Sequence, residues 1–269
     1  MDRKAIFITG AASGIGLATA KLFAAKGWFV GLADINAAGL NAALAEIGKD
    51  NGASFVLDVR DRAAWSAALE GFVKRAGRLD VLLNNAGIAS FGYLEEIAAE
   101  DEDRLVDVNL KGVLNGARAG IEHLKATPGS KLINVASCAG LYGAPKLAVY
   151  SATKFAVKGL SEALDIEFAR HGVQVRCIMP WFIETPILDA GAQGSNEKMS
   201  DTLRAQGMDV YPVEDAAQVV WEAAHGRDLH YTVGKAAKRL RFAARFMPNS
   251  VRKQLQKTSE QVQPGSGLS

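Results

Sequence analysis

The sequence predicts an α/β protein built on a doubly wound parallel sheet of about seven strands, with helices on both faces. Short apolar runs alternate with helical patterns from one end of the chain to the other, which is typical of a parallel sheet covered on both sides. A glycine-rich segment directly follows the first apolar run. The chain has 269 residues, of which 49% are hydrophobic, and this is enough for one large core.

The elements are expected in a regular order, with residues 1–260 forming a single domain. Strands buried in parallel sheets are continuous apolar runs, whereas the helices between them show a 3.6-residue period. The segment 182–210 departs from this pattern because glycines and polar residues interrupt short apolar pieces. We expect it to be a mobile excursion over the site. Strands are expected at 4–9, 28–33, 53–57, 79–83, 130–136, 173–179 and 229–233, and helices at 14–27, 36–49, 61–76, 95–125, 149–171 and 213–226.

The turn after the first apolar run has the composition of a phosphate-binding loop. Its glycines follow the spacing G-x-x-x-G-x-G, one residue wider than the G-x-G-x-x-G turn of Rossmann-type folds. Glycines let the backbone approach a pyrophosphate closely, and the amides and positive dipole end of the following helix attract its charge. An ordinary strand-to-helix turn is the competing interpretation. The residues expected to hold a dinucleotide are Gly10, Ser13, Gly14, Ile15 and Gly16.

The cofactor is expected to be NAD rather than NADP. Asp34 ends the second apolar run, 18 residues after Gly16, where a carboxylate can accept hydrogen bonds from both hydroxyls of the adenosine ribose. The 2′-phosphate of NADP would meet the like charge of Asp34, and neither Ser13 nor Ile35 offers a balancing cation.

A tyrosine and a lysine four residues apart form the candidate catalytic centre. Tyr150 and Lys154 lie in an alanine-rich stretch with a helical pattern, and positions i and i+4 share one helix face. Lowering the pKa of a phenol by ~3 units takes roughly 4 kcal/mol, which one cation about 4 Å away in a partly dry cleft can supply. The spacing predicts an activated tyrosine that serves as a general acid or base. The competing interpretation is a half-buried tyrosine beside a solvated lysine.

Between the turn from Thr9 to Gly16 and the Tyr150–Lys154 pair, the chain carries, in this order, Asp58-Val59 after the third strand, Asn84 to Gly87 after the fourth, Asn109, and Ser137 after the fifth. With these motifs, residues 4–234 resemble the short-chain dehydrogenase/reductase family, in its compact single-domain branch. The resemblance implies hydride transfer between a nicotinamide cofactor and an alcohol or ketone, with Tyr150 moving the proton. It also implies that Ser137 donates a hydrogen bond to the substrate oxygen. Lys154 would hold the nicotinamide ribose, and Asn109 would anchor a water that links Lys154 to solvent. Further motif positions that would contact or flank the cofactor are Asp58, Val59, Asn85, Ala86, Gly87, Pro180 and Thr185.

The chain departs from the family after the sixth strand, where Trp181 replaces the usual glycine of a Pro-Gly pair. An indole at this position must pack beneath the loop or intrude on the nicotinamide side of the pocket. We expect a largely apolar pocket that favours a hydrophobic secondary alcohol or ketone. Its expected lining is Trp181, Phe182, Tyr142, Phe91, Tyr93 and Cys138, although each aromatic residue taken singly is equally compatible with a core position.

Composition and charge exclude several other classes. A formal net charge of +2 gives no global reason to expect nucleic acid, two cysteines imply no disulfide framework, and four histidines show no metal-ligand spacing. Met1 to Arg3 are not followed by a signal-type segment, and no apolar run reaches ~18 residues. We expect a cytoplasmic protein without a metal. The resemblance implies a homodimer or homotetramer built on the long helices at 95–125 and 149–171.

The C-terminal segment is a second departure from the family. Residues 235–257 contain eight lysines and arginines, interleaved with apolar residues, and no acidic residue. We expect one basic helix here. Either it packs against its own domain or a neighbouring subunit, or it lies on a membrane surface. Residues 261–269 are expected to be a disordered tail.

Three functions from different classes therefore compete. The favoured one is an NAD-dependent dehydrogenase for a hydrophobic secondary alcohol. An NADP-dependent carbonyl reductase is disfavoured by Asp34, and a non-catalytic, NAD-binding redox sensor would have no use for a complete set of Asn109, Ser137, Tyr150 and Lys154.

Overall fold

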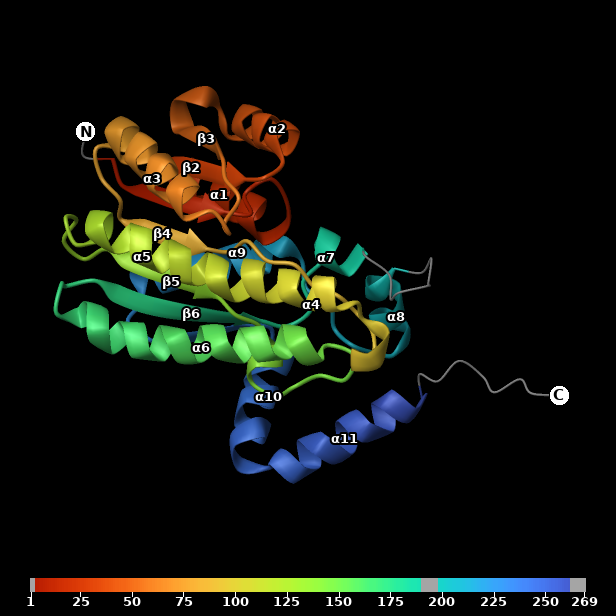
Figure 1. Ribbon diagram of the computed structural model, residues 1–269. Helices are drawn as coiled ribbons and strands as arrows, with labels where there is room; N and C mark the ends of the chain where they lie inside the picture. Colours follow the sequence, from red (N-terminus) through yellow and green to blue (C-terminus); the bar gives the residue numbers. More distant parts are fainter. Residues whose placement is uncertain (1–2, 190–197, 262–269) are drawn as a thin grey trace.

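The predicted doubly wound sheet is confirmed in a computed structural model, which describes residues 3–189 and 198–261. Seven strands form one parallel sheet in the order β3-β2-β1-β4-β5-β6-β7 (Figure 1). The order reverses direction beside β1, so the carboxyl ends of β1 and β4 border the crevice where such folds bind ligands. The strands are β1 (Ala5–Thr9), β2 (Phe29–Asp34), β3 (Gly52–Val56), β4 (Val81–Asn84), β5 (Lys131–Val135), β6 (Gln174–Pro180) and β7 (His230–Val233).

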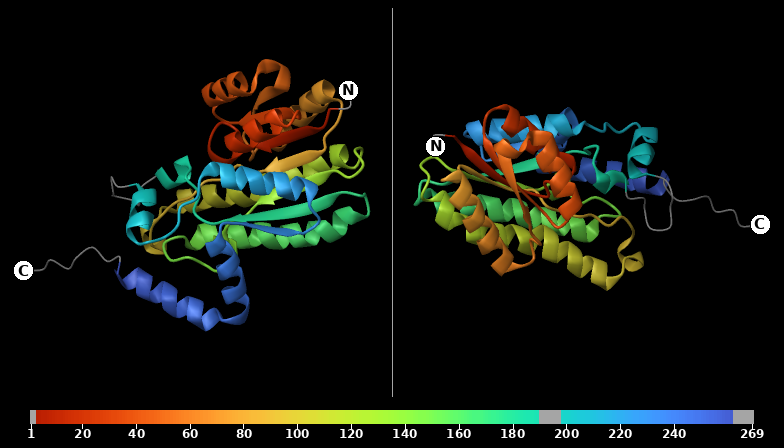
Figure 2. Two further views of the ribbon diagram at one scale, coloured as in Figure 1. Left: turned by 180° about the vertical axis from the view of Figure 1, so that it is seen from behind. Right: turned by 90° about the horizontal axis from the view of Figure 1, so that it is seen from above.

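Helices cover both faces of the sheet (Figure 2). Side chains alternate along a strand, so Ile6 and Ile8 of β1 enter one apolar core while Ala5 and Phe7 enter the other. The first core packs under α1 (Gly14–Ala25), α2 (Ala37–Ile47) and α9 (Val213–His225). The second packs under α3 (Arg62–Ala76), α5 (Gly112–Leu124) and α6 (Ala148–Ala169).

The single helix expected at 95–125 is interrupted in the structure. After a 3-10 turn (Leu94–Glu96) come α4 (Ala99–Val106), a π-helical turn (Asp107–Lys111) and then α5. The physical reason lies at Asn109, which is fully buried within the π turn. Its carboxamide pairs with both backbone groups of Ile88, at 2.9 Å each. The widened turn thus directs a helix side chain into the loop after β4, a use of π turns that is frequent at functional sites.

The segment after β6 is tied down at both ends. Ile183 forms a parallel bridge with Tyr211, and the Tyr211 amide donates to the Phe182 carbonyl at 2.9 Å. Two short helices, α7 (Pro186–Asp189) and α8 (Met199–Ala205), lie between these points. The predicted mobile excursion at 182–210 includes residues 190–197, which lie outside the described residues, and its mobility stays a prediction.

The C-terminal basic helix is two helices rather than the one predicted. They are α10 (Lys235–Phe246) and α11 (Pro248–Gln261), separated at Met247. Proline has no amide hydrogen and fits the first position of a new helix, so Pro248 starts α11. No helix among the described residues is both long and apolar enough to cross a membrane. The predicted disordered tail lies, from residue 262 onward, outside the described part of the chain.

Candidate active site

The glycine turn between β1 and α1 is shaped for close backbone approach. Gly10 and Gly14 have φ values of +66° and +53°, a region that L side chains rarely adopt. Gly16 packs against the carbonyl of Gly10, and a methyl group at Gly16 would overlap that oxygen. Ser13 precedes α1 without a side-chain cap bond, and the first turn carries no acidic residue. The amides at this end of α1 are therefore available to an anion.

The turn is clamped to the loop after β4 by a residue that the sequence analysis did not single out. The Thr9 hydroxyl accepts hydrogen bonds from the amides of Asn85 and Ala86, at 3.0 and 3.1 Å. The Asn85 carboxamide donates back to the Thr9 carbonyl at 2.9 Å. Thr9 is the last residue of β1. A threonine at the end of an apolar run is the sequence signal that could have identified this clamp. The clamp holds Asn85, Ala86 and Gly87 beside the glycine turn.

Asp34 ends β2 next to the same turn. Its carboxylate accepts hydrogen bonds from the Ala12 amide at 3.2 Å and from the Asn36 amide at 3.0 Å. Ile35 beside it is 65% exposed and brings no charge. The carboxylate is thus fixed at the edge of the crevice, where an adenosine ribose would lie on the Rossmann pattern.

Asp58 and Val59 follow β3 at the same edge. Arg60 forms a bidentate ion pair with Asp58, the shortest contact being 2.6 Å, and its guanidinium holds the pKa of that carboxyl below the usual value. The Val59 carbonyl accepts from the Trp65 indole and from Asn115, at 3.0 Å each. These bonds fix the loop that would flank the base of the dinucleotide.

Tyr150 and Lys154 come together on the first turns of α6, as their spacing predicts. The Lys154 ammonium lies 5.5 Å from the centre of the Tyr150 ring and donates to the Val135 carbonyl at 3.1 Å. Ser137 follows β5 and caps a 3-10 turn (Cys138–Gly140), its hydroxyl accepting from the Ala139 amide at 3.1 Å. Ser137 lies near enough to the Tyr150 phenol to lower the pKa of that group. Proton-transfer groups from β5 and α6 thus meet at one point.

Asn109 lies on the other side of the lysine. A methyl group built on Gly87 would lie 3.2 Å from Oδ1 of Asn109 and 3.5 Å from Nζ of Lys154, so Gly87 faces both. The Asn109 amide also donates to the Thr153 hydroxyl at 3.4 Å. Asn109 therefore holds the loop after β4 against α6. Its predicted role in anchoring a water near Lys154 stays a proposal.

The pKa shifts at the site differ from the sequence expectation. Burial raises the pKa of the Tyr150 phenol, and the nearby Ser137 opposes the rise without cancelling it. Burial also lowers the pKa of Lys154 to about 8. The expected lowering of the phenol pKa by Lys154 is thus absent here, because both groups lose water and the ammonium is directed to Val135.

Lys154 is expected to titrate near pH 8 rather than near its ordinary value. Its pKa is lower in the folded than in the unfolded chain, so its charged form destabilises the fold below pH 8. That penalty is relieved as the pH rises from 8 to the unfolded value of 10.5. Proton and carbon NMR of the lysine Cε groups tests this, with Lys154→Arg assigning the signal. A Lys154 signal that titrates at the ordinary lysine value of 10.5 would contradict the prediction.

Four predicted residues after β5 and β6 occupy distinct places. The Thr185 methyl faces Gly14 of the cofactor turn, and Pro180 ends β6. The Trp181 indole packs edge-on against Phe182, with centroids 5.2 Å apart, and its buried N–H has no hydrogen-bond partner. Cys138 is buried, with its thiol 3.6 Å from the Met179 carbonyl, and burial raises its pKa to about 12. The Cys138 thiol is therefore a poor nucleophile, and its predicted place in the pocket lining stays a proposal.

Tyr150 packs against an apolar cluster. Phe91 and Phe182 belong to it, as the pocket hypothesis expects, whereas Trp181, Tyr142 and Tyr93 do not. Tyr93 instead lies under the Lys146 ammonium, 4.9 Å from the ring centre. Sequence reasoning missed the aliphatic members, because lone aliphatic residues in loops carry no distinctive pattern. They are Leu147, Leu188 and Leu203, with Met199, Met208 and Val210 packed against them.

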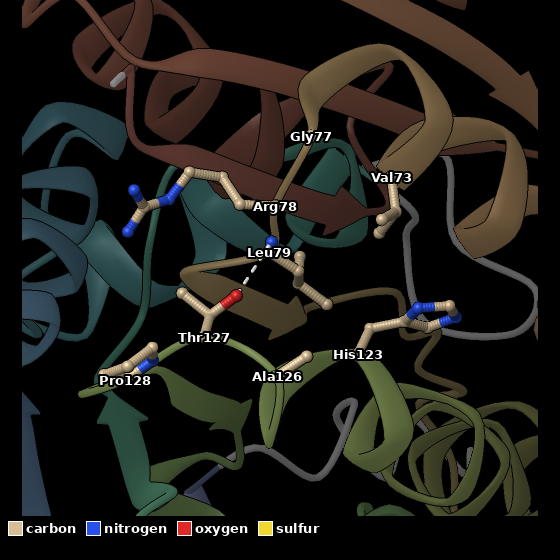
Figure 3. Close-up of a pocket in the computed structure, with 8 residues that line it drawn as sticks. All are labelled: Val73, Gly77, Arg78, Leu79, His123, Ala126, Thr127 and Pro128. Carbon is tan, nitrogen blue, oxygen red and sulfur yellow. Dashed lines mark hydrogen bonds between the residues drawn. The ribbon is translucent and has the colours of Figure 1, made fainter. Parts of the chain in front are cut away.

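A pocket of about 210 Å³ lies elsewhere, between the end of α3 and the segments that enter β4 and β5 (Figure 3). His123 and Thr127 line it, and the Thr127 hydroxyl accepts from the Leu79 amide at 3.4 Å. This is the amino-terminal edge of the strands, opposite to Thr9, Asp34 and Ser137. None of the predicted site residues lines it, so it is not the catalytic site.

The glycine turn, the aspartate after β2 and the tyrosine–lysine pair define an oxidoreductase of the nicotinamide-binding α/β class. The chain belongs to the short chain dehydrogenase family, whose model matches residues 4–196. It is 34% identical over 226 residues to a D-threitol dehydrogenase of Mycolicibacterium smegmatis, covering 83% of this chain and 87% of that one. It is 35% identical over 243 residues to a cyclopentanol dehydrogenase of a Comamonas species, covering 85% and 95%.

A solved structure agrees with this assignment. The 3-ketoacyl-(acyl-carrier-protein) reductase from Brucella melitensis, complexed with NADH, superposes with a TM-score of 0.76 at 31% identity. The match covers 86% of this chain and 96% of that one. The chain is thus an oxidoreductase that acts on alcohols or ketones, and its fold binds a nicotinamide cofactor.

Proposed function

We propose that this protein is an NAD-dependent dehydrogenase for a hydrophobic secondary alcohol, with Tyr150 as the general acid and base. The observation that carries the proposal is the meeting of Ser137, Tyr150 and Lys154 next to the loop after β4, which Thr9 clamps to the glycine turn. The cradle fits a dinucleotide, since it combines open helix amides, glycines that admit no side chain and a fixed carboxylate. When bound, the nicotinamide accepts a hydride from the alcohol carbon or returns it to the ketone.

The residues of the chain handle the proton. Oxidation of a secondary alcohol removes a hydride from carbon and a proton from oxygen, and negative charge builds on that oxygen. Tyr150 takes the proton in oxidation and returns it in reduction. Ser137 donates a hydrogen bond to the oxygen as charge develops. Lys154 would hold the nicotinamide ribose and, as a cation, would favour the ionised phenol. Asn109 holds the loop after β4 against α6 beside Lys154.

Asp34 is proposed to select NAD over NADP. Its carboxylate accepts from the two ribose hydroxyls and repels a 2′-phosphate. Asp34→Ala is expected to weaken NAD binding by about tenfold and to strengthen NADP binding by a similar factor, because a charged hydrogen bond contributes about 1.5–3 kcal/mol. Cofactor titration by intrinsic tryptophan fluorescence measures both affinities, with Asp50→Ala on the surface turn before β3 as the control. An NADP preference in the unmodified protein would overturn the assignment and favour the carbonyl reductase.

The apolar cluster that packs against Tyr150 supports a hydrophobic substrate. Of the two related dehydrogenases, the one named for cyclopentanol fits such a lining better than the one named for D-threitol. A screen of secondary alcohols, read by the absorbance of reduced nicotinamide, is expected to give a kcat/KM at least tenfold higher for cyclic or long-chain alcohols than for polyols. Trp181→Gly is expected to alter that ranking. Turnover of small polyols alone, unchanged by Trp181→Gly, would refute the proposed specificity.

The same screen separates the enzyme from the redox-sensing scaffold, since a scaffold binds NAD and turns over no alcohol. We also propose a homodimer or homotetramer in the cytoplasm. Exposed apolar side chains on the outer faces of α5 and α6 support self-association, because such residues commonly mark interfaces. They are Leu114, Phe155 and Ile166.

A further inference from the structure

The C-terminal arm carries a surface that the proposed catalysis does not use. We name residues 235–257, on α10 and α11, the basic arm. We propose that the basic arm docks the protein on the surface of an anionic lipid membrane. This inference stands apart from the proposed dehydrogenase activity, because no residue of the arm belongs to the catalytic or cofactor site.

The first observation is charge segregation. The arm holds eight of the chain's 31 lysines and arginines and none of its 29 acidic residues. The remainder of the chain, with 23 basic residues, is therefore net negative by six. An anionic membrane would repel the body and attract the arm, so the charge distribution itself orients the protein.

The second observation is the face that α10 presents outward. Ala237 is fully buried, and Leu240 and Ala244, on the same side of the helix, are half-buried, so this side packs on the protein. Phe242 and Phe246 lie on the opposite side, 58% and 63% exposed. Apolar side chains this exposed on the outer side of a packed helix bury little surface when the chain folds.

These two rings form one patch. Their centroids are 4.8 Å apart, as their spacing of four residues allows. Met247, 47% exposed, follows directly. The exposed cations that flank the patch on α10 are Lys235, Lys238, Arg239, Arg241 and Arg245. Aromatic residues encircled by cations on one helix surface are the pattern of helices that lie in a bilayer interface, with rings among the acyl chains and cations at the phosphates.

The third observation is the way the arm is mounted. Figures 1 and 2 show α10 leaving the edge of the sheet after β7 and α11 running at an angle to α10, below α6 and apart from it. The start of α10 is fixed, since the Lys235 amide donates to the Tyr211 hydroxyl at 3.1 Å and Gly234 lies against the Tyr211 ring with no room for a side chain. The patch is therefore held in place before any lipid is met, which lowers the entropic cost of docking.

Vesicle flotation of the full chain tests the proposal. We expect recovery with vesicles containing 30% phosphatidylglycerol in phosphatidylcholine, and little with phosphatidylcholine alone. The double variant Lys238→Gln/Arg245→Gln should lower the partition coefficient roughly 30-fold, at about fivefold for each cation removed. Phe242→Ser/Phe246→Ser should lower it about tenfold or more with all charges kept. The matched controls outside the arm, Lys74→Gln/Arg75→Gln and the comparably exposed Val56→Ser/Leu94→Ser, should float like the unmodified chain.

Three outcomes would overturn the proposal. Equal recovery on the two kinds of vesicle would remove the electrostatic argument. Vesicle binding that is unchanged by Phe242→Ser/Phe246→Ser and is competed by double-stranded DNA would show that the arm is a general polyanion site. The third outcome is that the protein does not float, that light scattering shows a dimer, and that Phe242→Ser/Phe246→Ser dissociates this dimer. A second copy of the chain would then cover the patch. Circular dichroism verifies that each variant is folded.

Discussion

Replacing Tyr150 by phenylalanine is expected to lower kcat about 1,000-fold while leaving the affinity for NADH within twofold. The substitution removes one oxygen and keeps the ring that packs in the apolar cluster. The proton then has no acceptor at the substrate oxygen, and a positioned acid or base contributes about 100- to 10,000-fold to such a step. Steady-state kinetics on the best alcohol from the screen and a fluorescence titration with NADH measure the two quantities.

Tyr231→Phe supplies the matched control, because Tyr231 lies on β7 away from Ser137 and Lys154. It should keep kcat within about twofold. Retention of turnover by Tyr150→Phe would refute the central role of this phenol. A proportional loss of kcat and NADH affinity would indicate that the ring positions the cofactor rather than moving a proton.

Replacing Gly16 by alanine is expected to weaken NAD binding at least 100-fold. The added methyl group would overlap the carbonyl oxygen of Gly10, and the Asn85 carboxamide lies in the same direction. Both neighbours belong to the clamped turn, so relief requires the cradle itself to open. Loss of a fixed anion site for a pyrophosphate then removes several charge-assisted hydrogen bonds. Isothermal titration with NAD measures the affinity, and thermal denaturation measures the accompanying loss of stability.

Gly159 offers a matched control for the same substitution. It lies within α6 with open space around it, so Gly159→Ala should raise stability by about 0.5–1 kcal/mol through its helix propensity and leave NAD binding unchanged. Unaltered NAD affinity in Gly16→Ala would mean that the dinucleotide does not lie in this turn.

The strands and the cofactor edge could be predicted from sequence because their signals are local. Each buried strand is a continuous apolar run, and Asp34, Asn85, Ser137 and Pro180 each stand where such a run ends. Parallel strands bring their carboxyl ends to one edge, so these residues had to meet. The order of the strands is carried by no local pattern and was not predicted; the structure supplies it.

Other features depend on contacts that the sequence does not display. The π turn at Asn109 exists because a carboxamide reaches the backbone of Ile88, 21 residues away. The break before Pro248 divides a segment whose charge pattern is continuous. The raised pKa of Tyr150 depends on burial against the cluster that contains Leu147 and Leu188. The i, i+4 spacing of Tyr150 and Lys154 in the sequence indicated only that a cation is near. Local pattern therefore indicated the candidate catalytic groups, and tertiary packing set their pKa values.

Tyr211 joins two parts of the molecule that were described separately. The Tyr211 backbone pairs with the segment after β6, in which Phe182 packs against the apolar cluster. The Tyr211 hydroxyl accepts a hydrogen bond from the first amide of α10. A ligand that displaces Phe182 would therefore act on the start of the basic arm through Tyr211 alone. If the arm is lipid-bound, attachment and substrate capture become linked equilibria, and by reciprocity each would shift the other's affinity by the same factor.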